Sequence, residues 1–180
     1  MRPIVMRPII LAVSVLAAAC SDQGSTSPTS PASTALATTP AQSRSATELP
    51  FRGSLTTDEK AVVAPPNLLA QGTGEGNATH LGRFTVTFAA VAPLGGNTAT
   101  GTFTFTAANG DQLLASFAGT AISIEPTVLS FTEVLTIAGG TGRFAQATGR
   151  FTLRRIGIID FANNTSTSTG SFEGHINLNN

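Results

Sequence analysis

The chain has 180 residues, with ten basic and ten acidic side chains and a formal net charge of zero. This balance, without a basic cluster, argues against nucleic acid as a partner. The single cysteine, Cys20, excludes a disulfide within one chain and a cysteine-based metal site, and we expect no cofactor.

The first predicted element is an export signal over residues 1–19. Arg2 and Arg7 precede a short apolar run that ends in three alanines immediately before Cys20. A basic start, a short apolar core and small residues before a cleavage site are typical of such signals. The position of Cys20 resembles that of the lipidated cysteine in bacterial lipoproteins. We therefore expect an extracytoplasmic bacterial envelope protein (outer membrane or periplasm), anchored to the membrane by a lipid on Cys20. A secreted protein with an ordinary cleaved signal is the alternative.

Residues 20–49 are predicted to form a disordered tether. They consist mainly of Ser, Thr, Ala and Pro, so they cannot bury enough apolar surface to offset the entropy lost on ordering. The remaining residues, 50–180, are predicted to form one domain of ordinary size.

Apolar and polar residues alternate throughout this domain. Phe84, Val86 and Phe88, for example, share one face of a predicted strand, and threonines occupy the other. Turn sequences such as Asn109-Gly110 separate the runs. The pattern gives about eight strands, near residues 51–56, 66–72, 79–92, 98–107, 112–124, 127–138, 148–160 and 168–178. We predict an all-β, eight-stranded antiparallel closed barrel, because closure removes exposed strand edges. A two-sheet sandwich is the alternative.

The glycine-rich segment "GGTGRF", residues 139–144, has two interpretations. A nucleotide-binding loop would have to open a helix whose amino terminus receives the phosphates. Instead, Gly149 and a Phe151/Leu153 alternation follow within ten residues. We therefore predict a hairpin between two strands.

That hairpin predicts a buried ion pair. If Leu135 lies opposite Leu153, the inward faces of the two strands match and Glu133 lies opposite Arg155. A paired charge is tolerable on an apolar inner face, whereas a lone charge is costly. A bulge would shift the register by one residue and make Arg154 the partner.

Candidate ligand-binding residues follow from this placement. Glu133 and Arg155 form an ionisable pair that could orient a polar ligand group, and a purely structural pair is the alternative. Phe88, Phe105 and Phe131, on predicted inward faces, are candidates for an apolar lining. An eight-stranded barrel of this kind is either filled by side chains or holds one small ligand.

No catalytic or metal-binding residues are predicted. His80 and His175 lie far apart in the sequence without clustered carboxylates, so a zinc site is not expected and both are predicted at the surface. A Gly-x-Ser-x-Gly nucleophile motif is also absent from the sequence.

The segment "GGTGRFAQATGRF" resembles the glycine-rich hairpin of the plant dirigent and allene oxide cyclase barrels and of bacterial secreted proteins with the same barrel. The positions that fit are Gly139, Gly140, Thr141, Gly142, Phe144, Ala147 and Gly149. The resemblance implies a calycin-like barrel, and it leaves open a homo-oligomer formed through outer faces, as in the plant relatives. Dirigent pockets use acidic, Arg and Tyr side chains, but this chain has no Tyr, so no pocket residue is carried over.

The function expected from these observations is noncatalytic. We expect the barrel to bind a small apolar or amphipathic molecule, or to serve as a surface interaction module. Two alternatives remain. The resemblance implies an isomerase or cyclase that shapes a reactive substrate, and a barrel filled by side chains would indicate a structural envelope protein.

Overall fold

A computed structural model describes residues 47–178 of the chain. The predicted signal, the predicted lipidation site Cys20 and the predicted tether as far as residue 46 lie outside the described residues. No helix within residues 47–178 is long and apolar enough to cross a membrane.

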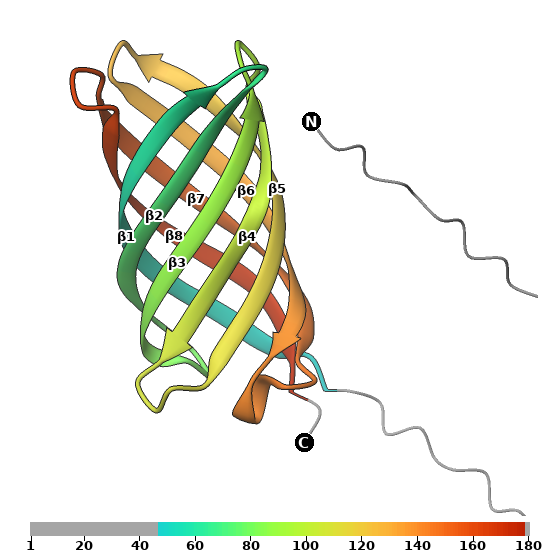
Figure 1. Cartoon of the computed structure of the whole chain (residues 1–180). Helices are drawn as coiled ribbons and strands as arrows, with labels where there is room; N and C mark the ends of the chain where they lie inside the picture. The colour runs from blue at the N-terminus through green and yellow to red at the C-terminus, as the bar shows by residue number, and fades with distance from the viewer. Residues whose placement is uncertain (1–46, 179–180) are drawn as a thin grey trace, which may run out of the picture. The chain divides into compact units, whose positions relative to one another are not determined.

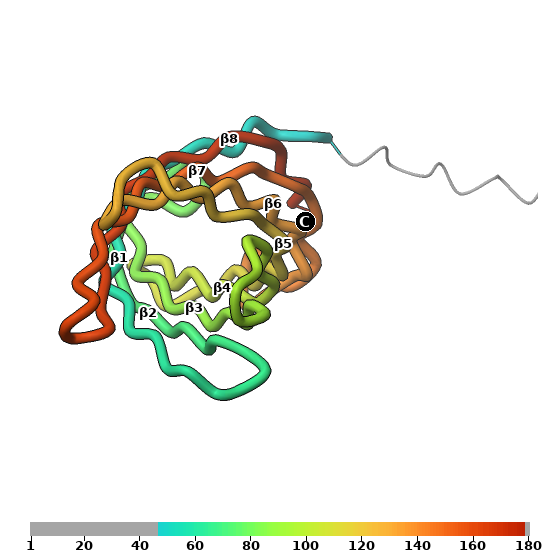
Figure 2. Tube along the Cα trace, turned by 90° about the horizontal axis from the view of Figure 1, so that it is seen from above, coloured from blue at the N-terminus to red at the C-terminus, as the bar shows by residue number. Residues whose placement is uncertain are grey.

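Eight antiparallel strands form a closed barrel in which each strand pairs with its neighbours in sequence and β8 pairs with β1 (Figures 1 and 2). The strands are β1 (Leu49–Ala64), β2 (Asn67–Ala78), β3 (Gly82–Pro93), β4 (Thr98–Ala107), β5 (Gln112–Glu125), β6 (Val128–Gly140), β7 (Thr148–Asp160) and β8 (Thr165–Asn177). The predicted barrel is therefore confirmed, and the sandwich alternative is wrong.

The two ends of the barrel differ. The turns β1–β2, β3–β4, β5–β6 and β7–β8 lie at one end, at the top of Figure 1, which we call the cavity end. The other three turns, the start of β1 and the end of β8 lie at the opposite end, which we call the core end.

The glycine-rich segment is a hairpin turn at the core end. After β6 ends at Gly140, the residues Gly142–Phe144 form a single 3-10 turn, and β7 begins at Thr148. Phe144 is fully buried, so the turn places its aromatic ring beneath the barrel interior. The Arg143 guanidinium donates to the carbonyl oxygen of Leu81 at 3.4 Å and joins this turn to the β2–β3 turn.

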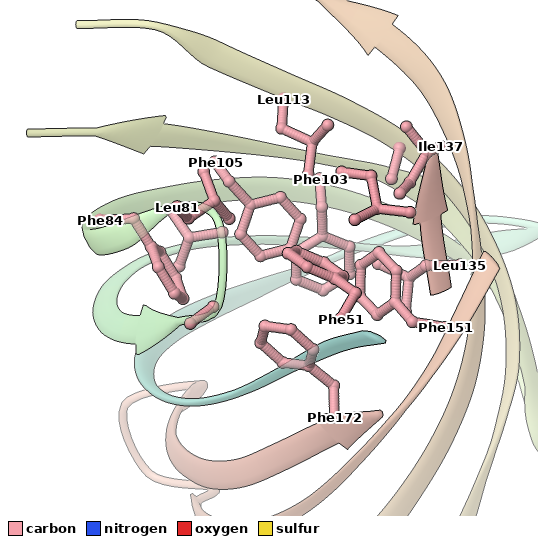
Figure 3. Packing of buried hydrophobic residues seen from close by; sticks show 14 of the residues in the cluster. Phe51, Leu81, Phe84, Phe103, Phe105, Leu113, Leu135, Ile137, Phe151 and Phe172 are labelled. Carbon is pink, nitrogen blue, oxygen red and sulfur yellow. The ribbon is translucent and has the colours of Figure 1, made fainter. Parts of the chain in front are cut away.

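Aromatic side chains fill the interior at the core end (Figure 3). Neighbouring rings stack or meet edge to face, with centroids 5.1 Å apart for Phe51 and Phe151 and 5.0 Å apart for Phe88 and Phe103. Nine of the eleven phenylalanines are buried, namely Phe51, Phe84, Phe88, Phe103, Phe105, Phe117, Phe144, Phe151 and Phe172.

Inward-facing glycines provide the room for these large side chains. A Cβ added to Gly53 would lie 2.5 Å from the Phe172 ring, and one added to Gly101 would lie 2.7 Å from the Phe117 ring. Each ring therefore lies across the backbone of a neighbouring strand, at a position where only glycine leaves enough space.

Strands β1 and β2 are longer than the sequence pattern predicts. Charged residues over 58–60 interrupt the apolar alternation of β1, yet the strand continues through them to Ala64. The reason is found in the barrel interior, where the Glu59 carboxylate is paired.

Most exposed large apolar side chains surround the cavity end. They belong to the ends of five strands and to two turns there. They are Val62, Val63, Leu69, Val91, Leu94, Ile122, Ile124, Ile156, Ile158 and Phe161, and among residues 47–178 only Leu114 lies elsewhere.

Candidate functional site

A buried polar layer crosses the barrel between the aromatic core and the cavity end. Its side chains come from four strands that are adjacent around the wall, β6, β7, β8 and β1. The members are Glu133, Arg155, Ser168, Thr57 and Glu59. Arg155 is only 3% exposed, so the guanidinium has exchanged nearly all of its water for these groups.

Arg155 holds the layer together. Its Nε donates to Oε2 of Glu133 at 2.9 Å and its Nη2 donates to Oε1 of the same carboxylate at 2.8 Å, a two-point contact that fixes both side chains. Its Nη1 donates to Oε1 of Glu59 and, at 3.3 Å, to the hydroxyl of Thr57. Ser168 also donates to Oε1 of Glu59, at 2.8 Å.

Aromatic rings surround the guanidinium. The carbon at its centre lies 4.9 Å from the Phe131 ring centroid, 5.2 Å from that of Phe88 and 5.9 Å from that of Phe103. Such contacts favour a cation over the ring faces and exclude water from the ion pairs.

In the polar layer, burial and ion pairing shift the pKa values of Glu133 and Arg155 in opposite directions. Desolvation raises the pKa of Glu133 above its usual range, and the lowering by Arg155 does not fully compensate. For Arg155, burial alone would lower the pKa, but Glu133 and Glu59 together raise it. Arg155 is therefore always charged, and removing it would leave two buried carboxylates unpaired, a change that typically costs about 3–5 kcal/mol.

Glycines support the layer in the same way that they support the core. A Cβ on Gly119 would lie 2.8 Å from Cγ of Glu133, and one on Gly170 would lie 2.6 Å from Cγ of Arg155. The two charged side chains therefore pass over bare backbone on the neighbouring strands.

A cavity of about 180 Å³ lies above the polar layer, toward the cavity end. The polar layer contributes Glu59, Glu133 and Arg155 to its lining, and small or apolar side chains make up most of the wall. The wall includes Leu68, Ala70, Phe88, Ala90, Ala92, Ala99, Phe117, Gly119, Ala121, Leu129 and Phe131, with Gly96, Asn97 and Thr98 from the β3–β4 turn and the start of β4.

A larger hollow of about 620 Å³ is lined mainly by residues of β1 to β4. It is wide open, and outward-facing polar residues such as Ser54, Thr56 and Glu75 make up much of its lining. A small ligand would remain largely hydrated there. The cavity above the polar layer is less open and has charged groups at its base, so it is the better candidate site.

The predicted ion pair between Glu133 and Arg155 is confirmed, but the predicted register is wrong by two residues. Leu135 lies opposite Phe151, and Glu133 lies opposite Leu153. The pair is therefore diagonal across the strands. Hydrophobic alternation cannot distinguish registers that differ by two residues, because both keep the same side chains inside.

The other predicted site residues separate into two groups. Phe88 and Phe131 line the cavity together with Glu133 and Arg155. Phe105 lies in the aromatic core, completely buried and outside the cavity lining. Arg154, the alternative ion-pair partner, points outward and lies 3.9 Å from Glu173.

The histidines lie outside the site. His80 is in the β2–β3 turn with a φ of 64°, and His175 is exposed on β8. Within residues 47–178, no three His, Cys, Asp or Glu side chains come together in a way that could hold a metal ion.

Glu59 is not among the predicted site residues, although the sequence carries a signal for it. Alternate residues of β1, from Phe51 through Leu55 and Thr57, face inward, and the same alternation places Glu59 inside. The predicted strand ends at residue 56, so it stops short of Thr57 and Glu59.

Comparison with models of protein families, with curated proteins and with solved structures gives no match.

Proposed function

We propose that the barrel binds one small apolar or amphipathic molecule in the cavity above the polar layer. The observation that supports this proposal is that the two ends of the barrel interior are filled differently. Rings fill the core end, whereas at the cavity end small side chains leave about 180 Å³ above a base that carries charges. Cavities destabilise a fold, so a barrel interior that served only as a packed core would be expected to fill this space with larger side chains.

The volume limits the ligand. An apolar cavity of about 150 Å³ accommodates benzene, and sites for drug-sized molecules begin at about 300 Å³. The proposed ligand is therefore about the size of one six-membered ring with a short substituent. The resemblance to dirigent and allene oxide cyclase barrels keeps an isomerase or cyclase as the alternative, but such an enzyme would need a substrate equally small.

A matched pair of variants on one strand tests the proposal. Ala90 lines the cavity, and its neighbour Ala89 faces outward. We expect benzyl alcohol, added to the full chain, to shift the amide NMR signals of Phe88, Gly119 and Phe131. Ala90→Leu should abolish these shifts by filling the cavity, and Ala89→Leu should retain them. Absence of shifts in the wild type, or identical shifts in both variants, would exclude the cavity as the site.

We also propose that the protein is a membrane-anchored envelope protein, held through Cys20. The apolar side chains around the cavity end support contact with a lipid surface. They are distributed around the barrel and are not confined to one flat patch, so this end as a whole could enter the lipid. The 28 residues between Cys20 and Leu49 could extend at most about 100 Å, more than the length of the barrel, so an anchored chain could place this end on its own membrane.

A further inference from the structure

The polar layer contains more negative than positive charge. Two carboxylates, those of Glu133 and Glu59, converge on the single guanidinium of Arg155. The nearest other cationic side chains in sequence, Lys60 and Arg154, are exposed. Among the described residues, the buried layer therefore has one carboxylate in excess.

The excess belongs to Glu59. Both oxygens of Glu133 accept hydrogen bonds from Arg155, so this pair is satisfied by itself. Glu59 shares Arg155 through Oε1 only. Its Oε2 accepts one bond, from the hydroxyl of Ser166 at 3.4 Å, the upper limit for a hydrogen bond.

This oxygen can accept more, and Glu59 lies in the cavity lining. A carboxylate oxygen has two lone pairs and forms its strongest hydrogen bonds with charged donors. The guanidinium is already engaged with both carboxylates and lies among the rings of Phe88 and Phe131. A ligand in this cavity therefore encounters a base with spare acceptor capacity and surplus negative charge.

We propose that the cavity selects a small molecule that carries a protonated amine on a ring-sized apolar body, with the ammonium group bound to Oε2 of Glu59. This inference rests on the proposed function and names the class of ligand for the same cavity. An ammonium group would bring the buried charges to two positive and two negative. A ligand carboxylate would instead place a third negative charge beside two others in a region of low dielectric, which is unfavourable.

Three ligands with one skeleton test the inference. Benzylamine, benzyl alcohol and benzoate differ mainly in charge at neutral pH, and each is close to the size that the cavity admits. Titration calorimetry with the full chain should give benzylamine the tightest binding, about tenfold tighter than benzyl alcohol, with benzoate the weakest.

Glu59→Gln removes the charge and preserves the shape of the side chain. It leaves the Glu133–Arg155 pair balanced, so we expect the variant to fold, which circular dichroism verifies. Its affinity for benzylamine should fall to that for benzyl alcohol, and its affinity for benzyl alcohol should be unchanged. Glu173→Gln, on the exposed outer face of β8, is the control and should bind all three ligands as the wild type does.

The outcomes separate the two proposals. If benzyl alcohol binds as tightly as benzylamine, or if Glu59→Gln does not alter the preference, the amine inference is wrong and the binding function stands. Benzoate as the tightest ligand would also overturn the inference, because Arg155 would then control selection. If none of the three ligands binds, the proposed function itself is wrong.

Discussion

Glu133 illustrates how a buried carboxylate can be firmly held and still be difficult to ionise. Arg155 contacts both of its oxygens, yet the carboxylate has lost its water and shares the guanidinium with Glu59. Burial is the larger effect, so the pKa of Glu133 in the folded protein lies above its ordinary value of 4.5.

This direction predicts a pH dependence of stability. Because the folded state holds the Glu133 proton more tightly than the unfolded state, the stability contributed by this proton is complete below the ordinary pKa. It is lost as the pH rises through the raised pKa. Glu133→Gln cannot titrate. The free energy of unfolding of the wild type, relative to this variant, should therefore decrease from about pH 4 upward and then become constant.

Urea unfolding of both proteins between about pH 4 and pH 8 measures this difference. A difference that instead grows in favour of the wild type as the pH rises would mean that Arg155 lowers the pKa of Glu133, contrary to our assignment.

At the scale of the strands, interior glycines determine where large side chains can lie. Gly170 on β8 leaves the space that the aliphatic part of Arg155 occupies. Gly170→Ala would bring a methyl group within 2.6 Å of Cγ of Arg155 and against the carbonyl oxygen of Arg154, and the backbone atom cannot easily move away.

We expect Gly170→Ala to lower the free energy of unfolding by about 1–3 kcal/mol, the usual cost of overpacking. Gly96→Ala is the matched control, because its new methyl group would approach the Pro93 carbonyl oxygen no closer than 3.2 Å in an exposed turn. Urea unfolding compares the two variants. Equal losses of stability would show that the space beside Arg155 is not the cause.

The sequence predicts some strands better than others. β3 to β7 were located to within a few residues, since Phe, Val and Thr alternate without interruption and turn residues mark their ends. The predicted strand over 51–56 is shorter than β1, whose second half contains the charged residues Asp58, Glu59 and Lys60 and lacks a clear apolar alternation. An inward-facing charge is favourable only when it is paired inside the barrel. The partner of Glu59 is Arg155, which lies 96 residues later in the sequence, on β7.

Part of the candidate site was predictable from the sequence. Glu133 and Arg155 interrupt two neighbouring apolar faces, and local pairing brings them together. The cavity itself could not be predicted, because it depends on small residues from several strands meeting at one level of the closed barrel. Alternation also cannot show that Phe105 and Phe131 lie at different depths.

At the scale of the whole molecule, the outer surface is unevenly apolar. The exposed apolar side chains gather around the cavity end, where Lys60, Glu125 and Asp160 are among the few charged groups. In the proposed contact with a membrane, an end with this composition would favour a neutral lipid surface over an anionic one, because it carries no basic cluster.

We therefore expect the full chain with Cys20→Ser, which removes the proposed lipid attachment site, to sediment with neutral phosphatidylcholine vesicles. Combining Ile122→Ser, Ile156→Ser and Ile158→Ser should weaken this binding by about tenfold or more, since three apolar side chains would no longer enter the lipid. Leu114→Ser, also exposed but away from the cavity end, should have little effect. Equal binding by the triple variant and the wild type would place the lipid contact elsewhere.

The pairing of β1 with β8 has a consequence for biosynthesis. Leu49 lies opposite Ile176, so both edges of β1, the first strand of the barrel, are paired only after β8, the eighth, has been made. Until then, β1 and the most recently formed strand each present open backbone groups that can join another chain. The hazard of misassembly is therefore concentrated in the interval before β8 is available, and it ends when the barrel closes.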